Sequence, residues 1–294
     1  MPEIKFLKRL EAAPNVKTQI FALQPSGASP VVLRRYAESF GLDPKRGTLA
    51  QDPAKFTYSD GQHVVTLYRA SGALRYQDQS RWQRDDGEAN LKISDGRAEK
   101  LALEVVRKLN LASPKEFGLL KVSRLTVGSA NSDAKEADER IIDVGVAFQR
   151  TIGGVPVDGP GGKLIVYLDH KGQMTGIDRI WRPIKGQQKP VEGLRDPAEA
   201  EKDIERYWQG HEDGVIEVRD VRFGYFELGF QDAQRVLQPA YIYLLRLVSP
   251  PGRDAPDDQP IAMNSVHIYP AAVNAVGTFM PPPKKLVEQT PRKE

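Results

Sequence analysis

The chain contains no cysteine, and this absence removes several kinds of chemistry together. It excludes disulfide bonds, thiolate nucleophiles, cysteine-ligated zinc and iron–sulfur clusters. Histidine is also scarce, and the four histidines are far apart in the sequence: His63, His170, His211 and His267. A hydrolytic zinc site of the His-Glu-x-x-His type needs two histidines one helical turn apart. The sequence has no such pair, so we expect no metal and no cofactor.

His211 is the one weak candidate for a metal ligand, because Glu212 and Asp213 follow it directly. It comes just after the end of a predicted helix, where a solvated histidine is favoured by the helix dipole without any metal. We therefore favour the structural interpretation of His211.

Motifs of other enzyme classes are missing as well. No Gly-x-Ser-x-Gly elbow is present, so the sequence offers no recognisable serine nucleophile. The run Gly159-Pro160-Gly161-Gly162 is rich in glycine, but a predicted strand follows it, and no Lys-Ser/Thr pair does. It therefore predicts a turn or a β-bulge and not a phosphate cradle. We expect a protein that is not an enzyme.

Charge of one sign is not in large excess, and long apolar runs are absent. The chain has 42 Lys and Arg residues against 39 Asp and Glu, interspersed along its length, for a net charge of +3. Nucleic-acid binding needs clustered basic residues, so we expect no nucleic-acid partner. No segment approaches the roughly 20 apolar residues of a membrane span. The start of the chain lacks the apolar core of a signal peptide. This favours the cytoplasm and leaves open a secreted or periplasmic protein if the chain is a mature form.

The segment Val144–Trp181 predicts three consecutive antiparallel strands. Its first part alternates apolar and small or polar residues with a period of two, as a half-buried strand does. The run Leu164–Leu168 has almost no polar break and predicts a central, buried strand. A hairpin at residues 169–172 then leads into an alternating return strand.

Three amphipathic helices are predicted from their apolar spacing and their N-caps. Ser29 and Asp196 are the N-caps of the first and third helices, and the second helix follows Ser94-Asp95. Runs of β-type residues follow each helix. Between them lie turn signals such as Asp60-Gly61 and Ser71-Gly72.

This pattern predicts an α+β protein of three tandem helix-plus-antiparallel-sheet modules. The expected division is an N-terminal arm, three modules and a C-terminal tail: residues 1–28, 29–84, 94–184, 195–272 and 273–294. Each helix would cover one face of its own sheet.

The run from Phe148 to Ile177 resembles PepSY domains and the related propeptide modules of thermolysin- and fungalysin-type proteases. It contains Gly-Val-Pro-Val, then Gly-Gly-Lys-Leu-Ile-Val-Tyr-Leu-Asp, then Gly-Gln-Met-Thr-Gly-Ile. The run Leu237–Tyr243 resembles a Leu-x-Pro-Ala-Tyr strand found late in such proteins. The resemblance implies a cystatin-like fold and a binding, inhibitory or chaperone-like role. No protease domain follows in this chain, so we expect no propeptide role in cis.

Four aromatic side chains are candidates for ligand binding: Trp82, Trp181, Tyr225 and Tyr241. The two tryptophans each end a predicted sheet and would plug a junction between modules, with a ligand-stacking platform as the alternative. The two tyrosines belong to an aromatic concentration that core packing explains more simply than nucleic-acid stacking does.

Three hypotheses about function follow. The first is a non-enzymatic binding, regulatory or assembly protein whose sheet edges accept a polypeptide partner or a second copy. The second is a hydrolase or isomerase whose polar groups converge at a module interface. The third is a small-ligand carrier that uses a cavity between helix and sheet.

Overall fold

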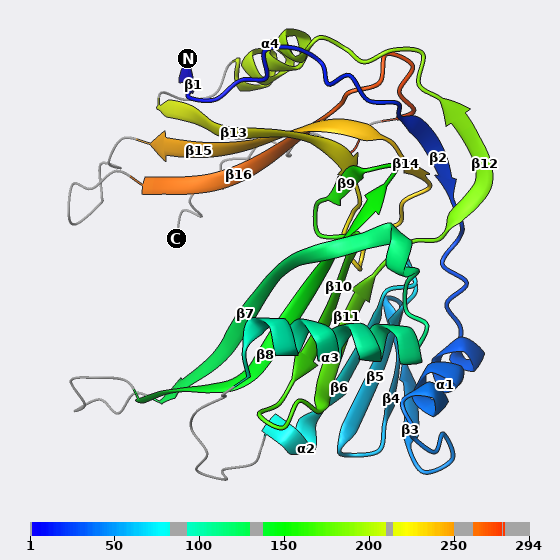
Figure 1. Ribbon diagram of the computed structural model, residues 1–294. Coiled ribbons are helices and arrows are strands. Elements are labelled where there is room, and N and C mark those ends of the chain that lie inside the picture. The colour runs from blue at the N-terminus through cyan, green and yellow to red at the C-terminus, as the bar shows by residue number, and fades with distance from the viewer. Residues whose placement is uncertain are drawn as a thin grey trace, which may run out of the picture. The chain divides into compact units, whose positions relative to one another are not determined.

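The computed structural model describes residues 2–82, 93–129, 138–209, 214–249, 261–277 and 279 (Figure 1). Strands make up 46% of the structure and helices 18%. The chain forms two compact units, and each is assembled from separate pieces of sequence. Unit 1 consists of Met1–Phe21, Gln188–Phe226 and Gln238–Glu294, and unit 2 of Ala22–Gln187 and Glu227–Leu237.

The prediction of three tandem helix-plus-sheet modules is wrong. In unit 2, β6 (Leu74–Asp78) pairs antiparallel with β11 (Met174–Ile180), so strands of the first two predicted modules form one sheet. Alternating patterns show that a segment is a strand, but they do not show which strand its backbone will pair with. The sequence therefore predicted the strands and missed their long-range pairing.

The sheet of unit 2 has the strand order β9-β8-β10-β11-β6-β5-β4-β3, and β7 pairs with β8. All of these pairings are antiparallel. The remaining bounds are β3 (Thr48–Gln51), β4 (Lys55–Ser59), β5 (His63–Tyr68), β7 (Phe117–Ser129), β8 (Asp138–Ile152), β9 (Val155–Asp158) and β10 (Lys163–Leu168).

Two helices cover one face of this sheet (Figure 1). Helix α1 (Pro30–Ser39) packs on β4 and β5, and α3 (Asp95–Lys108) packs on β7, β8 and β10. The predicted N-cap of α1 is confirmed, because Ser29 accepts a hydrogen bond from Val32 N. The structure shows that Ser94 caps α3 by accepting a hydrogen bond from Arg97 N. The core between helices and sheet includes fully buried residues of α1, β5, α3, β8, β10 and β11: Leu33, Ala37, Val65, Ala98, Ala102, Val106, Val144, Val146, Leu164, Val166 and Ile177.

Successive side chains of a strand point to opposite faces, so the other face of this sheet can be identified from the register. Leu164 and Val166 lie in the core beneath α3, which places Lys163, Ile165 and Tyr167 on the face away from the helices. Ile165 is paired with Asp178. Asp178 in turn is paired with Arg75, so the helix-free face carries a row of polar side chains.

In unit 1 the strand order is β16-β15-β13, and α4 (Pro197–Trp208) packs on these strands. Its strands are β13 (Val215–Phe226), β15 (Pro239–Ser249) and β16 (Ile261–Pro270). The N-cap of α4 is confirmed, because Asp196 accepts a hydrogen bond from Ala198 N. The predicted N-terminal arm contributes β1 (Glu3–Phe6), which pairs in parallel with the first residues of β13.

The remaining elements are short. A three-stranded sheet has the order β12-β2-β14, with bounds β12 (Ile184–Pro190), β2 (Gln19–Leu23) and β14 (Val236–Leu237). The one-turn helices are α2 (Gln79–Trp82) and the 3-10 helix η1 (Pro114–Glu116). None of the helices in the described ranges is long and apolar enough to cross a bilayer.

Local turn predictions agree with the structure. Gly61 and Gly72 have φ values of 90° and 70°, the left-handed region that glycine adopts without strain. Most of the predicted C-terminal tail, residues 273–294, lies outside the described residues.

Candidate functional site

The sequence-predicted aromatic residues do not gather in one place. Trp181 belongs to unit 2, where it is 5% exposed and packs edge-on against Phe117 at 6.3 Å. The guanidinium of Arg150 lies 5.0 Å from the centre of its ring. Trp82 is the last residue of α2, and its side chain lies outside the described part. The ring of Trp181 is therefore engaged by the protein's own side chains.

Tyr225 and Tyr241 belong to unit 1 and are 2% and 0% exposed. The hydroxyl of Tyr225 accepts a hydrogen bond from the backbone N of Gln19 at 3.1 Å. The hydroxyl of Tyr241 donates one to the carbonyl of Arg195 at 2.6 Å. Both rings are built into the interior of unit 1, as the core-packing interpretation predicts, and ligand binding by these tyrosines remains a prediction without support in their surroundings.

Burial raises the pKa of Tyr241 from 10 to about 12, with nearby Asp196 adding to the shift. A raised pKa in the folded state stabilises the fold below pH 10, and this contribution is lost as the pH rises through 12. We expect the denaturant midpoint of unit 1 to fall across this window. A Tyr241→Phe variant should show a shallower fall, measured by urea unfolding at several alkaline pH values. An equal fall in the variant would contradict a role for this hydroxyl.

Histidines do not form a metal site in the described part of the chain. No group of three or more His, Cys, Asp or Glu side chains is arranged there to hold a metal ion. His63 lies 3.0 Å from Asp60 in a hairpin. His211 lies outside the described residues, so its prediction stays open.

One pocket of about 290 Å³ lies on the helix-free face of the unit 2 sheet. Its floor is formed by β6, β10 and β11, and its walls by two loop residues, Pro160 and Phe230. The pocket is mostly apolar, with a few charged groups among the lining residues: Tyr68, Ala73, Leu74, Arg75, Pro160, Lys163, Ile165, Asp178, Arg179, Ile180 and Phe230. The carrier hypothesis placed a cavity between helix and sheet, whereas this pocket opens on the opposite face.

The charged groups of the pocket are held in fixed positions. Arg75 donates two hydrogen bonds to Asp178, from Nε to Oδ1 at 2.6 Å and from Nη2 to Oδ2 at 3.1 Å. This hydrogen bonding, against the opposing effect of burial, raises the pKa of Arg75. Tyr167 lies 3.4 Å from the same carboxylate, and its pKa is raised to about 12 by burial first and by Asp178 second. Lys163 Nζ donates to the carbonyl of Val157 at 2.9 Å.

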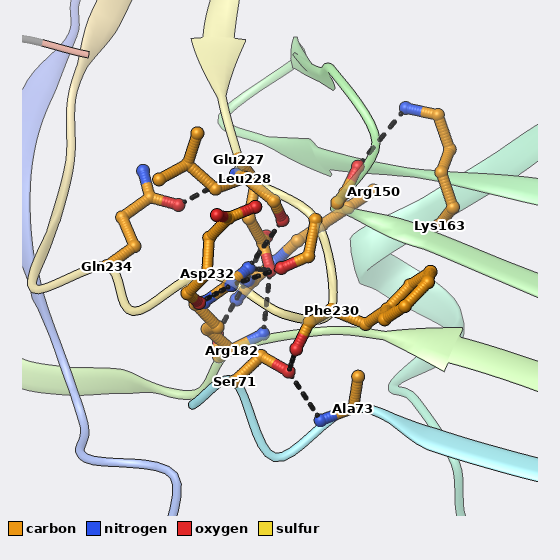
Figure 2. A network of polar contacts seen from close by, with 12 residues as sticks. Ser71, Ala73, Arg150, Lys163, Arg182, Glu227, Leu228, Phe230, Asp232 and Gln234 are labelled. Atoms are coloured by element: carbon orange, nitrogen blue, oxygen red, sulfur yellow. Dashed lines mark hydrogen bonds and ion pairs between the residues drawn. The ribbon is translucent and has the colours of Figure 1, made fainter. Parts of the chain in front are cut away.

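A polar network behind the pocket fixes the loop that carries Phe230 (Figure 2). Arg182 donates to the carbonyls of Leu228, Gly229 and Asp232 at 2.7, 2.7 and 2.6 Å. Ser71 Oγ donates to the carbonyl of Phe230 at 2.6 Å. The loop backbone is therefore held at four carbonyls.

Glu227 joins this loop to the turn that carries Pro160. Its backbone N donates to Asp158 O at 3.0 Å, and its carbonyl accepts from Gly161 N at 2.8 Å. Gly161 is required there, because a Cβ would lie 2.5 Å from the carbonyl of Leu228. Both walls of the pocket are thus anchored to one buried residue.

The Glu227 carboxyl is itself fully buried between two arginines. It accepts hydrogen bonds from Arg182 N at 3.0 Å and from Arg182 Nη1 at 3.1 Å, and Arg150 Nη1 lies 3.7 Å away. Burial raises the pKa of Glu227, while the hydrogen bonds and charges of the two arginines oppose the rise. A buried carboxylate keeps its charge only with such partners, so the three side chains act as one unit.

Sequence reasoning missed this site. Arg75, Lys163 and Asp178 are ordinary charged residues on predicted strands, and no motif links them. Only Phe230 stood out, as part of the aromatic concentration in the third predicted module. The available signal was the alternation of buried and exposed side chains along β6, β10 and β11. It identifies the residues that share the pocket face only once the pairing of these strands is known.

Two long strands each have one free edge in the described part of the chain. β7 pairs only with β8, and β16 pairs only with β15. β7 is interrupted by a register shift between Leu119 and Lys121 and another between Leu125 and Thr126. β16 is regular over ten consecutive pairs with β15.

Comparison with known proteins adds little. No protein-family model matches the chain, and no curated protein matches it. The resemblance to PepSY modules therefore stays a prediction. Among solved structures, an uncharacterized protein from Eubacterium rectale is 11% identical, with 88% of this chain and 85% of that chain covered and a TM-score of 0.47. A likeness this distant carries no argument about function.

Proposed function

We propose that this is a protein-binding and assembly protein that pairs with a second copy of itself along β16. The single observation behind the proposal is the free edge of β16, a regular ten-residue strand without a charged residue. Its exposed apolar side chains include Met263 and Val266, at 59% and 45% exposure. A long, regular and uncharged edge is a template for adding another strand.

The edge of β7 is less suited to this role. It carries Lys121 and Arg124, and its ladder is broken by two register shifts. Charged residues and bulges are the devices by which proteins protect edges from pairing. β16 has neither, so the two free edges differ in the features that control strand addition.

A second copy is the partner that the chemistry of β16 favours. Two β16 strands related by a twofold axis run antiparallel, and each presents the same uncharged surface to the other. No like charges would meet in any register of this pairing, because residues 261–270 include no Lys, Arg, Asp or Glu. The sheet of unit 1 already takes up one distant segment at its other side, where β1 pairs with β13.

The test is the oligomeric state of the purified chain, measured by size-exclusion chromatography with light scattering over a range of concentrations. We expect a dimer. A Met263→Lys, Val266→Lys double variant should weaken the dimer at least tenfold, about 1.4 kcal/mol, because it places like charges at the paired edge.

The matched control is a Val273→Lys, Val276→Lys double variant. Both valines belong to unit 1, are 62% and 45% exposed and lie outside β16. This control adds the same charge and should leave the dimer intact. A monomeric wild-type protein, or equal weakening by both double variants, would contradict pairing along β16.

A further inference from the structure

The pocket of unit 2 has the composition of a binding site for a small anion. Two lining residues on this face are basic, Arg75 and Lys163, and one, Asp178, is acidic. Arg179 also lines the pocket, but its Nε donates to the carbonyl of Leu111 at 2.7 Å. At about 290 Å³ it is at the small end of the range for ligand sites, roughly 300–1,000 Å³. The volume fits one ring or a short aliphatic chain with a single polar group.

Arg75 supplies the anion contact. Its Nε and Nη2 are used by Asp178, whereas its Nη1 makes no hydrogen bond to any residue in the described ranges. The Arg75 side chain is about a third exposed, so this donor is accessible. An arginine whose orientation is fixed by a carboxylate is a preorganised donor for a second carboxylate, because its planar fork is already in place.

Phe230 and Tyr68 supply the apolar contact. Their rings lie 4.5 Å apart, and the Phe230 ring lies 5.7 Å from the Arg75 guanidinium. Ile165, two residues after Lys163 on β10, also lines the pocket. An aromatic or aliphatic group in the pocket would therefore contact side chains that adjoin the charged donor.

The walls need little rearrangement to accept a ligand. The carbonyls on either side of Phe230 are bound by Arg182, and the carbonyl of Phe230 itself is bound by Ser71. A pocket whose walls are already ordered loses less conformational entropy on binding. This accounts for the cluster of buried polar groups behind a surface loop.

We propose that the pocket formed by Arg75, Lys163, Tyr68 and Phe230 binds a small monocarboxylic acid with an aromatic or aliphatic body. The carboxylate pairs with Arg75 Nη1, and the body packs against Phe230 and Tyr68. The proposal concerns unit 2 alone and does not depend on pairing along β16.

Three probes separate the two parts of the proposal: phenylacetate, its neutral amide phenylacetamide, and acetate. Their binding to the full chain is measured by NMR titration at constant ionic strength. We expect saturable binding of phenylacetate, with phenylacetamide and acetate each at least tenfold weaker. Equal binding of the amide would overturn the anion contact, equal binding of acetate would overturn the apolar contact, and no saturable binding would overturn both.

Substitutions locate the binding. Arg75→Gln and Phe230→Ala should each weaken phenylacetate at least tenfold. Arg46→Gln is the matched control, because it removes the same charge from a side chain that is 84% exposed outside the pocket. Unchanged binding in a folded Arg75→Gln protein, or an equal loss in Arg46→Gln, would overturn the assignment. Phe230→Ala, which leaves the Arg75–Asp178 pair intact, keeps the test decisive if Arg75→Gln does not fold.

Discussion

An Arg182→Met protein should lose about 3–5 kcal/mol of the free energy of unfolding of unit 2. Arg182 and Glu227 are 2% and 0% exposed, and they are joined by an ion pair of 3.1 Å. Removing the arginine side chain leaves the buried carboxylate with Arg150 as its only charged partner among the described residues and the backbone N of residue 182 as its hydrogen-bond donor. It also leaves the carbonyls of Leu228, Gly229 and Asp232 without their donor. A buried charge or acceptor that loses its partner costs far more than an exposed one.

The free energy of unfolding is measured by urea denaturation, with circular dichroism as the signal that monitors it. Arg46→Met removes the same charge from the surface and should change stability by less than about 0.5 kcal/mol. An Arg182→Met, Glu227→Met double variant should be less destabilised than the sum of its single variants, because no unpaired carboxylate remains. Full additivity would mean that the two side chains do not act as one unit.

Replacing Phe148 with alanine should cost about 3–5 kcal/mol, the range for removing a buried aromatic side chain. Phe148 is 1% exposed in the core of unit 2 and packs edge-on against Phe117 at 5.1 Å. The cavity would lie beneath the central strands, where well-packed neighbours relax only in part. Thermal and urea unfolding both report the loss.

Leu119→Ala is the comparison for this substitution. Leu119 is opposite Phe148 in the β7–β8 ladder, but it is 45% exposed. Its loss should cost less than about 1 kcal/mol, since little apolar surface leaves the core. A similar loss for both variants would mean that Phe148 is not central to the packing of unit 2.

Local features were predictable from the sequence, because their causes lie within a few residues. The caps of α1 and α4 depend on Ser29 and Asp196, each two or three residues from the group it binds. The run Leu164–Leu168, predicted as a buried strand, lies within β10 (Lys163–Leu168). Such features follow from turn chemistry and periodicity alone.

Pairings between distant segments were not predictable in the same way. Arg75 and Asp178 are 103 residues apart, and Arg182 and Glu227 are 45 residues apart. Nothing in the local pattern of β6 marks it as the neighbour of β11 and not of another strand. The pocket depends on the pairing of β6 with β11 and on the contact of Arg182 with Glu227. A fold prediction of separate modules contains neither, so it also missed the site.

Both units are discontinuous in the sequence, and this affects the order in which their parts are synthesised and how each unit can be cloned. The segment Glu227–Leu237 of unit 2 is encoded between β13 and β15 of unit 1. During synthesis Arg182 therefore leaves the ribosome 45 residues ahead of the carboxylate that neutralises it. Neither unit can be cloned as one uninterrupted gene fragment. A fragment of residues 22–187 would carry the pocket's floor and its arginines without Phe230 or Glu227, so a circularly permuted gene is the route to an isolated unit 2.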